Sequence, residues 1–181
     1  MLKHGILGLL NYGDMTGYEI NEAFENSLNF FWPAQTSQIY RELTVLEKNK
    51  WIVKQTVEQS GKPNKNICSI TEDGRKELLR WLKDTDINIY MRFPALMKIF
   101  FMGELPFSNS LDFLRQLGEQ YRIDLEALQH TDTSIKSYQE MIPDKKSALF
   151  WQMTADFGKR YAQMYLEWIE NCIYLLENME E

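Results

Sequence analysis

The first 83 residues carry three short helical patterns and then two short strand patterns, and this order constrains the fold more than any other feature. In residues 2–12, apolar side chains recur at steps of three and four, which is the spacing of the buried face of a helix. Gly13 follows, and glycine commonly follows the last turn of a helix. We therefore expect a first helix over residues 2–12.

A second helix is expected to begin at Thr16, because MTGYEI contains a capping box. Thr16 can accept a hydrogen bond from the backbone of Glu19, and the Glu19 carboxylate can accept one from the backbone of Thr16. Met15 and Ile20 stand at the positions of a hydrophobic staple. The apolar spacing continues to Leu28, which sets the expected length of this helix.

The third helical segment, SQIYRELTVLEK (37–48), has two sides of different chemistry. Its inner side is apolar and consists of Ile39, Leu43 and Leu46. Its opposite side contains no carboxylate and consists of Ser37, Arg41, Thr44 and Lys48, with Gln38 and Tyr40 on the two shoulders. In a chain of net charge -6, a face without acid is either an ordinary solvated face or a surface that meets something negative.

Residues 51–70 change to strand character. WIVKQTV (51–57) is rich in β-branched and aromatic residues, QSGKPNKN (59–66) has the composition of a turn, and ICSI (67–70) is a second short run. Together they predict a β-hairpin with a long, basic tip. Three helices followed by a hairpin predict a winged helix-turn-helix domain.

A fourth helix is expected over residues 72–83, because Thr71 can cap its first turn. Its inward side is expected to consist of Leu78, Leu79 and Leu82. This helix leads out of the module, so we expect a winged-helix domain over residues 1–86 and a second domain over residues 87–181.

Positive charge is concentrated in the winged-helix region although the chain as a whole is acidic. Residues 1–86 hold 11 Lys and Arg against 12 Asp and Glu, whereas residues 87–181 hold 9 against 14. Residues 41–65 are locally basic, with six Lys and Arg against three Glu. This strip includes Lys62 and Lys65 of the hairpin tip.

The third helix and the hairpin tip together predict a surface for double-stranded DNA. In a winged helix, the third helix enters the major groove and the hairpin reaches the neighbouring backbone or minor groove. Arg can bind guanine with two hydrogen bonds and Gln can pair with adenine. The alternative is a winged helix used for protein contacts, because the overall acidity opposes DNA binding at long range.

The second half of the chain is helical in period, so the fold is expected to be mainly α with a small β-wing. Pro94 can start a helix whose buried side is Leu96, Ile99 and Phe100, and Ser108 can cap a long helix that follows. The regular pattern weakens at residues 130–134. A final helix of roughly 30 residues completes the domain.

The final helix has more apolar surface than one neighbouring helix would cover. One apolar line runs from Phe150 to Met179, and a second contains Tyr165, Ile169, Ile173 and Leu176. Either the first domain covers the excess or a second copy of the chain does so across a two-fold axis. We expect a homodimer whose two-fold interface is built by this helix and the first helix of the chain, and on this helix includes Tyr161, Met164, Trp168, Cys172 and Leu175.

Several motifs of the first 83 residues occur in the order and spacing of one family: HGILGLL (4–10), TGYEI (16–20), SQIYREL-x-x-LE (37–47), GKPNKN (61–66), SITEDG (69–74) and WL (81–82). In these motifs the chain resembles the PadR family of bacterial transcriptional regulators. The resemblance implies a dimeric winged-helix regulator, usually a repressor, that binds an inverted repeat.

The resemblance also implies roles for single residues. Tyr18 is expected to contact a phosphate, Gln38, Tyr40 and Arg41 the operator groove, and Lys62 and Lys65 the backbone beside the wing. This chain departs from the family at the returning strand, where it reads Lys65, Asn66, Ile67, Cys68. One basic residue and one aromatic ring of the family pattern are missing there, so the wing contact is expected to be weaker.

Relatives of this type, some of which respond to phenolic acids, place small aromatic ligands where the winged domain meets the C-terminal helices. Candidate residues for such an effector site are Phe31, Trp32, Phe150, Trp151 and Met153. The alternative is that these rings and this methionine are core residues, as aromatic side chains at helical spacing usually are.

The sequence argues against an enzyme, a metal site or a cofactor. It contains no P-loop, G-x-G-x-x-G, G-x-S-x-G or H-E-x-x-H motif. His4 and His130 are its only histidines, and His4 is expected to be structural. Cys68 and Cys172 lie far apart and are expected to be reduced. Neither a signal peptide nor a membrane-length apolar stretch is found, so we expect a cytoplasmic protein.

Overall fold

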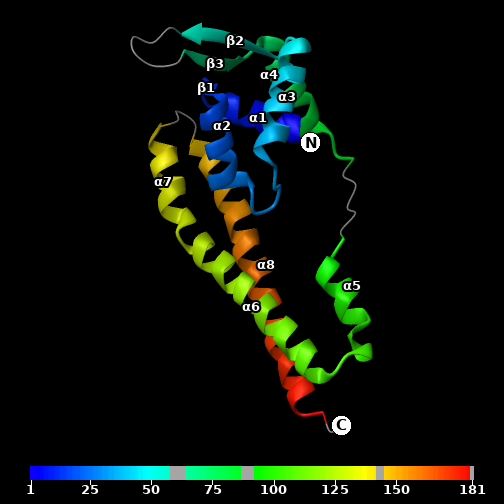
Figure 1. Cartoon of the computed structure of the whole chain (residues 1–181). Helices are drawn as coiled ribbons and strands as arrows, with labels where there is room; N and C mark the ends of the chain where they lie inside the picture. The colour runs from blue at the N-terminus through cyan, green and yellow to red at the C-terminus, as the bar shows by residue number, and fades with distance from the viewer. Residues whose placement is uncertain (58–63, 87–91, 142–144, 180–181) are drawn as a thin grey trace. The chain divides into compact units, whose positions relative to one another are not determined.

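The computed structural model describes residues 1–57, 64–86, 92–141 and 145–179. The chain divides into two compact units, Met1–Ile89 and Tyr90–Glu181, each with its own fold (Figure 1). Most of the described residues are helical, and three strands of the first unit form an antiparallel sheet. This confirms the expected mainly α fold with a small β-wing.

The first unit contains the four helices that the sequence predicted: α1 (Leu2–Leu10), α2 (Gly17–Ala23), α3 (Thr36–Lys48) and α4 (Glu72–Lys83). α2 continues as a π-helical segment, η1 (Phe24–Leu28), to the predicted end. α1 ends at Leu10, and Asn11 rather than Gly13 follows its last turn.

The predicted caps explain where α2 and α4 begin. The Thr16 N–H donates to Glu19 Oε2 at 2.7 Å, and the Glu19 N–H donates to Thr16 Oγ1 at 3.2 Å, which completes the capping box. Thr71 Oγ1 accepts from the Gly74 N–H at 3.0 Å at the start of α4. Each bond satisfies a backbone donor that a helix start would otherwise leave unpaired.

The sheet has the strand order β1-β3-β2, where β1 is Met15–Thr16, β2 is Ile52–Val57 and β3 is Lys65–Ile70. β3 begins two residues before the run that the sequence indicated, so Lys65 pairs with Val57 within the hairpin. The sequence did not predict β1. Its two residues pair with Cys68 and Ile67 of β3 and join the start of α2 to the wing.

The core of the first unit draws on all its helices and on β2 and β3. Its buried apolar residues are Ile6, Leu7, Leu10, Ile20, Phe24, Ile39, Leu43, Leu46, Ile52, Cys68 and Leu78. The expected inward side of α4 was partly wrong, because Leu79 and Leu82 are exposed. The line that faces inward instead contains Gly74, Leu78 and Trp81. A Cβ atom on Gly74 would lie 2.1 Å from the Trp51 carbonyl oxygen, so only glycine fits there.

α1 and α4 are joined by a buried polar cluster around Glu77. His4 Nε2 lies 3.1 Å from Glu77 Oε1, and the Arg80 guanidinium donates two hydrogen bonds of 2.8 Å to the same carboxylate. The His4 ring stacks on Trp81 with 4.6 Å between ring centroids. His4 is therefore a structural residue, as expected.

The second unit contains α5 (Pro94–Phe100), a 3-10 turn η2 (Met102–Glu104), α6 (Phe107–Gln129), α7 (Thr131–Met141) and α8 (Lys145–Glu177). α6 and α8 lie side by side and run in opposite directions, and α7 lies along the start of α8 (Figure 1). The predicted break near residue 130 and the predicted start at Pro94 are confirmed.

Two details of the second unit differ from the expectation. α6 begins at Phe107 after Pro106, so Ser108 lies inside the first turn and does not cap it. α5 has no buried residue in this single chain, although Leu96, Ile99 and Phe100 were expected to face inward. Spacing identifies an apolar side but does not say whether the same chain covers it.

Candidate nucleic-acid interface

The outer face of α3 is fully presented to solvent. The three predicted inner residues, Ile39, Leu43 and Leu46, are buried. The six side chains predicted for the outer face and its shoulders are all exposed: Ser37, Gln38, Tyr40, Arg41, Thr44 and Lys48. The packing of α3 therefore leaves this face free for a ligand.

Local hydrogen bonds already use part of this face. Gln38 Oε1 accepts from the Gln35 N–H at 3.0 Å, so only the side-chain NH₂ of Gln38 is free to face outward. The Thr44 hydroxyl donates to the Tyr40 carbonyl at 3.2 Å and can offer a ligand only an acceptor oxygen. In the described part of the chain, Arg41 and Lys48 form no ion pair, so they are the strongest outward donors.

Tyr40 packs against the first turn of α2. A Cβ atom on Gly17 would lie 2.7 Å from Tyr40 Cε1, so the absence of a side chain at residue 17 makes room for the ring. Tyr18 is the next residue and is 70% exposed. The fold thus brings Tyr18 and Tyr40, which lie far apart in the sequence, to the same end of the interface.

Two acidic residues near the basic strip are held by local partners, Glu47 by a lysine of β2 and Glu19 mainly by Thr16. Lys54 of β2 donates to Glu47 of α3 at 2.6 Å. Hydrogen bonds from Thr16 hold the pKa of the Glu19 carboxyl below its usual value, and the nearby charge of Lys65 lowers it further. Lys65 is exposed but is thus partly balanced by Glu19, and Lys62 lies outside the described residues.

Lys50 is a basic residue at this surface that the sequence reasoning did not assign to the interface. It is exposed and has a positive φ of 59°, immediately after the last turn of α3. The Trp51 N–H donates to the Leu46 carbonyl at 3.0 Å across this turn. Such a turn needs a residue with positive φ just after the helix, and this residue is usually glycine. Because residue 50 is a lysine, the turn could not be recognised in the sequence.

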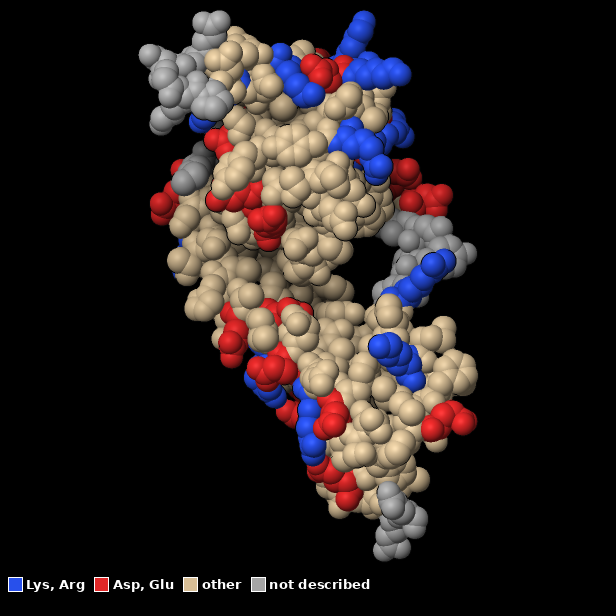
Figure 2. Space-filling model, viewed as in Figure 1, with Lys and Arg blue, Asp and Glu red and all other residues tan. Residues whose placement is uncertain are grey.

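Figure 2 shows, on the face in view, Lys and Arg side chains gathered at the end of the first unit that holds α3, α4 and the wing strands. Over the second unit the basic and acidic side chains are mixed. This matches the sequence, in which residues 87–181 carry 9 basic against 14 acidic side chains. The basic surface is therefore local and belongs to the first unit.

The five residues proposed for an effector site occur in both units, and each unit shows only its own part. In the first unit Phe31 and Trp32 are exposed, and Phe31 meets Phe30 edge to face with 4.7 Å between ring centroids. In the second unit Phe150 and Met153 are exposed. Trp151 packs against Ile135, Ala148 and Ala155 as a core residue would.

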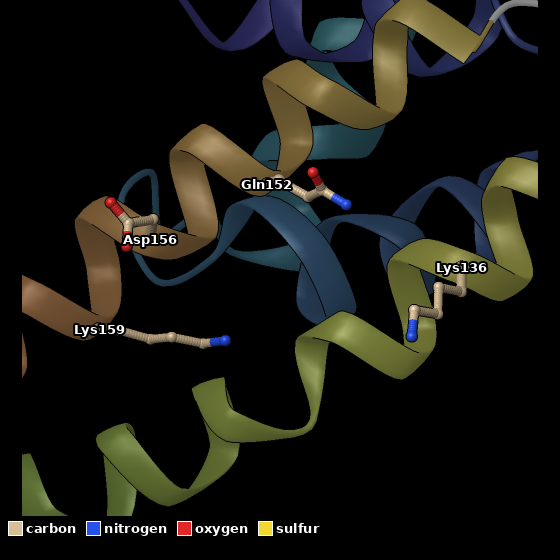
Figure 3. A pocket seen from close by; sticks show the side chains of 4 residues that line it. All are labelled: Lys136, Gln152, Asp156 and Lys159. Atoms are coloured by element: carbon tan, nitrogen blue, oxygen red, sulfur yellow. The ribbon is translucent and has the colours of Figure 1, made fainter.

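Two hollows on the described surface of the second unit are lined by residues other than the predicted effector residues. One, of about 400 Å³, lies between α7 and α8 and is polar, with Lys136, Gln152, Asp156 and Lys159 around it (Figure 3). The other, of about 650 Å³, is mainly apolar and is lined by residues of α5, η2 and the start of α6.

The stripe predicted for a dimer interface lies along one side of α8 and is only partly covered. Met164 and Leu175 are 52% and 58% exposed, whereas Tyr161, Trp168 and Cys172 are half-buried. The second apolar line of α8 faces α6: Tyr165 stacks on Tyr121 with 4.3 Å between ring centroids. α6 therefore covers the second line of α8 and part of the predicted interface stripe, of which Met164 and Leu175 stay exposed.

The described residues contain neither a membrane-length apolar helix nor a metal-binding group of three or more His, Cys, Asp or Glu side chains. Cys68 is buried and Cys172 half-buried, and both are free thiols.

Each half of the chain matches a known protein family. Residues 6–80 match the transcriptional regulator PadR-like family, and residues 91–177 match the C-terminal domain of the virulence activator alpha family. A probable transcriptional regulator of Mycobacterium tuberculosis is 42% identical over 83 residues, which cover 46% of this chain and 44% of that protein.

The negative transcriptional regulator PadR of Bacillus subtilis is 27% identical over 186 residues, with 98% of each chain covered. The crystal structure of that protein in complex with operator DNA has a TM-score of 0.80, with 97% of this chain and 98% of that chain covered. Another crystal structure of it, in complex with p-coumaric acid, shares the fold with a TM-score of 0.73 at 24% identity, over 98% and 99% of the two chains. On these sequence and structural matches, this chain belongs to the PadR-like family of transcriptional regulators.

Proposed function

We propose that this protein is a cytoplasmic transcriptional repressor that binds an inverted-repeat operator in double-stranded DNA as a homodimer. One observation carries the proposal: the exposed face of α3 bears Arg41 and Lys48 without an acidic partner among the described residues. Phosphates and base edges of the major groove require such a face. No step in this function calls for catalysis, a metal or a cofactor.

A second copy of the chain is required for sufficient affinity for DNA, and the exposed apolar surface of the second unit supports a dimer. One small domain that makes a few phosphate contacts binds weakly at physiological salt, and two half-sites double the contacts. The second unit exposes two apolar regions, the stripe on α8 and the segment of α5 and η2, where Phe100 and Met97 are 81% and 67% exposed. Exposed apolar surface of this extent is typical of a protein interface.

A small aromatic effector that releases the operator is the second part of the proposal. The Bacillus subtilis relative has been crystallised with p-coumaric acid. In this chain, Phe31 and Trp32 of the first unit and Phe150 and Met153 of the second offer exposed apolar surface to such a ligand. Addition of phenolic acids to the protein–DNA complex is expected to release the DNA, and the absence of release at millimolar ligand would remove this part alone.

The central test is a selection of bound fragments from random duplex DNA by the full-length protein. The recovered sites are expected to share an inverted repeat whose half-site centres lie about one helical turn, or a multiple of it, apart. Arg41→Ala is expected to lose about 1–3 kcal/mol of preference for this site over random DNA. Arg122→Ala removes an exposed arginine from α6 and serves as the matched control.

The alternative, a winged helix used for protein contacts, predicts a different result. A specific DNA-binding protein selects a shared site, loses affinity steeply as the salt concentration rises, and loses site preference in Arg41→Ala. A protein-contact module shows none of these three effects.

A further inference from the structure

The shoulder of the outer face of α3 that holds Gln38 also carries, seven residues later, one apolar side chain that the fold does not use. Val45 is 43% exposed and does not belong to the buried core of the first unit. It lies one turn after Arg41 and three residues before Lys48, so on the helix surface it neighbours both cations of the proposed interface.

Folding does not explain a valine at this position. An exposed β-branched residue has lower helix propensity than Ala or Lys, because its χ1 freedom is lost against the preceding turn. It also adds apolar surface beside two charged groups. Packing within the chain gives this side chain no role, and contact with a ligand that covers this face would give it one.

The edges of the bases in the major groove consist of hydrogen-bond donors and acceptors, with one apolar exception, the C5-methyl group of thymine. We infer that Val45 reads the C5-methyl group of a thymine in each half-site and so selects thymine over cytosine at that position. This inference rests on the proposed function and adds a specificity-determining residue to it.

The test uses the operator recovered by selection, with each thymine of one half-site replaced in turn by deoxyuridine. Deoxyuridine keeps the pairing with adenine and the O4 acceptor and lacks only the methyl group. Burial of one methyl group corresponds to about fourfold in affinity, so replacement of the contacted thymine in this one half-site is expected to weaken wild-type binding about fourfold.

Val45→Ala removes the contact from both half-sites, so it is expected to bind the thymine operator about 16-fold more weakly than wild type and to show no difference between thymine and deoxyuridine at that position. The matched control is Val53→Ala, which removes another exposed valine, 54% exposed, from β2 and is expected to keep the full methyl preference. Val45→Ala is expected to unfold at a slightly higher urea concentration than wild type, because Ala has the higher helix propensity, and Val53→Ala at a slightly lower one, because Ala disfavours a strand.

The inference is overturned if no thymine of the half-site shows a methyl preference, or if Val45→Ala keeps it while the operator is still bound specifically. In those cases the proposed function stands. If the selection recovers no shared sequence at all, the proposed function and this inference fail together.

Discussion

The two units of this protein treat their apolar side chains in opposite ways. In the first unit, large side chains such as Ile6, Phe24 and Leu46 are at most 2% exposed, and they come from helices on every side of the core. In the second unit, Phe100, Phe150 and Phe157 are 81%, 62% and 62% exposed, while the buried positions of α8 include the small residues Ala148, Ala155 and Ala162.

This difference indicates which unit is complete in one chain. The first unit closes its own core and exposes a polar face, which suits a ligand rich in charge. In the second unit α8 packs against α6 and α7, and its small residues Ala148 and Ala155 lie in a buried cluster with Ile135 of α7, whereas the large rings named above lie on the outside. The exposed apolar surface of the second unit is typical of a subunit that is covered by a second copy in a dimer. Four substitutions test this difference between the two units.

The largest effect is expected in the closed core. Gly74→Ala places a Cβ atom 2.1 Å from the Trp51 carbonyl oxygen, so the backbone of α4 or β2 must move. We expect a loss of about 4 kcal/mol or more in the free energy of unfolding, measured by urea titration of the circular dichroism. Gly8→Ala is the control, because a Cβ atom there meets nothing within 4 Å, and alanine favours the helix.

In the second unit, a charge on the apolar stripe of α8 should separate the subunits of the dimer and leave the fold of each chain intact. Met164→Glu is expected to raise the dimer dissociation constant by about 30-fold or more, since it buries an unpaired carboxylate in an apolar interface. Sedimentation velocity measures the change, and Gln163→Glu, on the polar side of the same turn, provides the control. A wild-type chain that is monomeric at micromolar concentration would contradict the contrast between the units.

The polar cluster in the first unit gives its stability a defined pH dependence. Hydrogen bonds from Arg80, followed by those from His4 and Lys3, lower the pKa of Glu77 from 4.5 to about 2. Burial lowers the pKa of His4 below 6.5. Both pKa values are lower in the folded state, so the stabilisation is complete above the unfolded pKa of each group and is lost as the pH falls through the folded one.

Between pH 5 and pH 2, wild type is therefore expected to lose about 1–2 kcal/mol more stability than Glu77→Gln, with solvent screening of Arg80 reducing the effect. Urea titrations at pH 5, 4, 3 and 2 check this. Equal losses in the two proteins would show that Glu77 does not carry the acid sensitivity.

The smallest effect concerns the turn between α3 and the wing. Lys50 has a φ of 59°, which costs a residue with a side chain about 1 kcal/mol relative to glycine. Lys50→Gly is expected to raise the free energy of unfolding by about that amount and, if Lys50 contacts a phosphate, to flatten the salt dependence of DNA binding. Lys48→Gly, in the last turn of the helix, should destabilise the protein instead.

The sequence predicted those parts of the fold that depend on local chemistry. The capping box at Thr16 and Glu19, the cap at Thr71 and the helix start at Pro94 are all interactions within a few residues, and the structure contains each of them. The inner line of α3 was also predictable, because helical spacing alone determines which side of the helix is apolar.

The errors concern contacts between distant residues. The strand β1 exists because Met15 meets Cys68, 53 positions away, and two residues carry no strand pattern of their own. Leu79 and Leu82 looked like core residues, but α4 turns Gly74 and Trp81 towards the core instead. At the candidate interface, exposure was foreseen, whereas the hydrogen bonds that occupy Gln38 and Thr44 were not.

The two-residue strand β1 has a mechanical consequence. Thr16 is both a rung of the sheet beside β3 and the N-cap of α2, and α2 packs on α3. β1 therefore ties the hairpin to α2 and, through α2, to α3, so the offset between the hairpin and α3 is set when the chain folds. A duplex that matches this preset offset is bound with little loss of conformational entropy, whereas one with a different groove width has to deform.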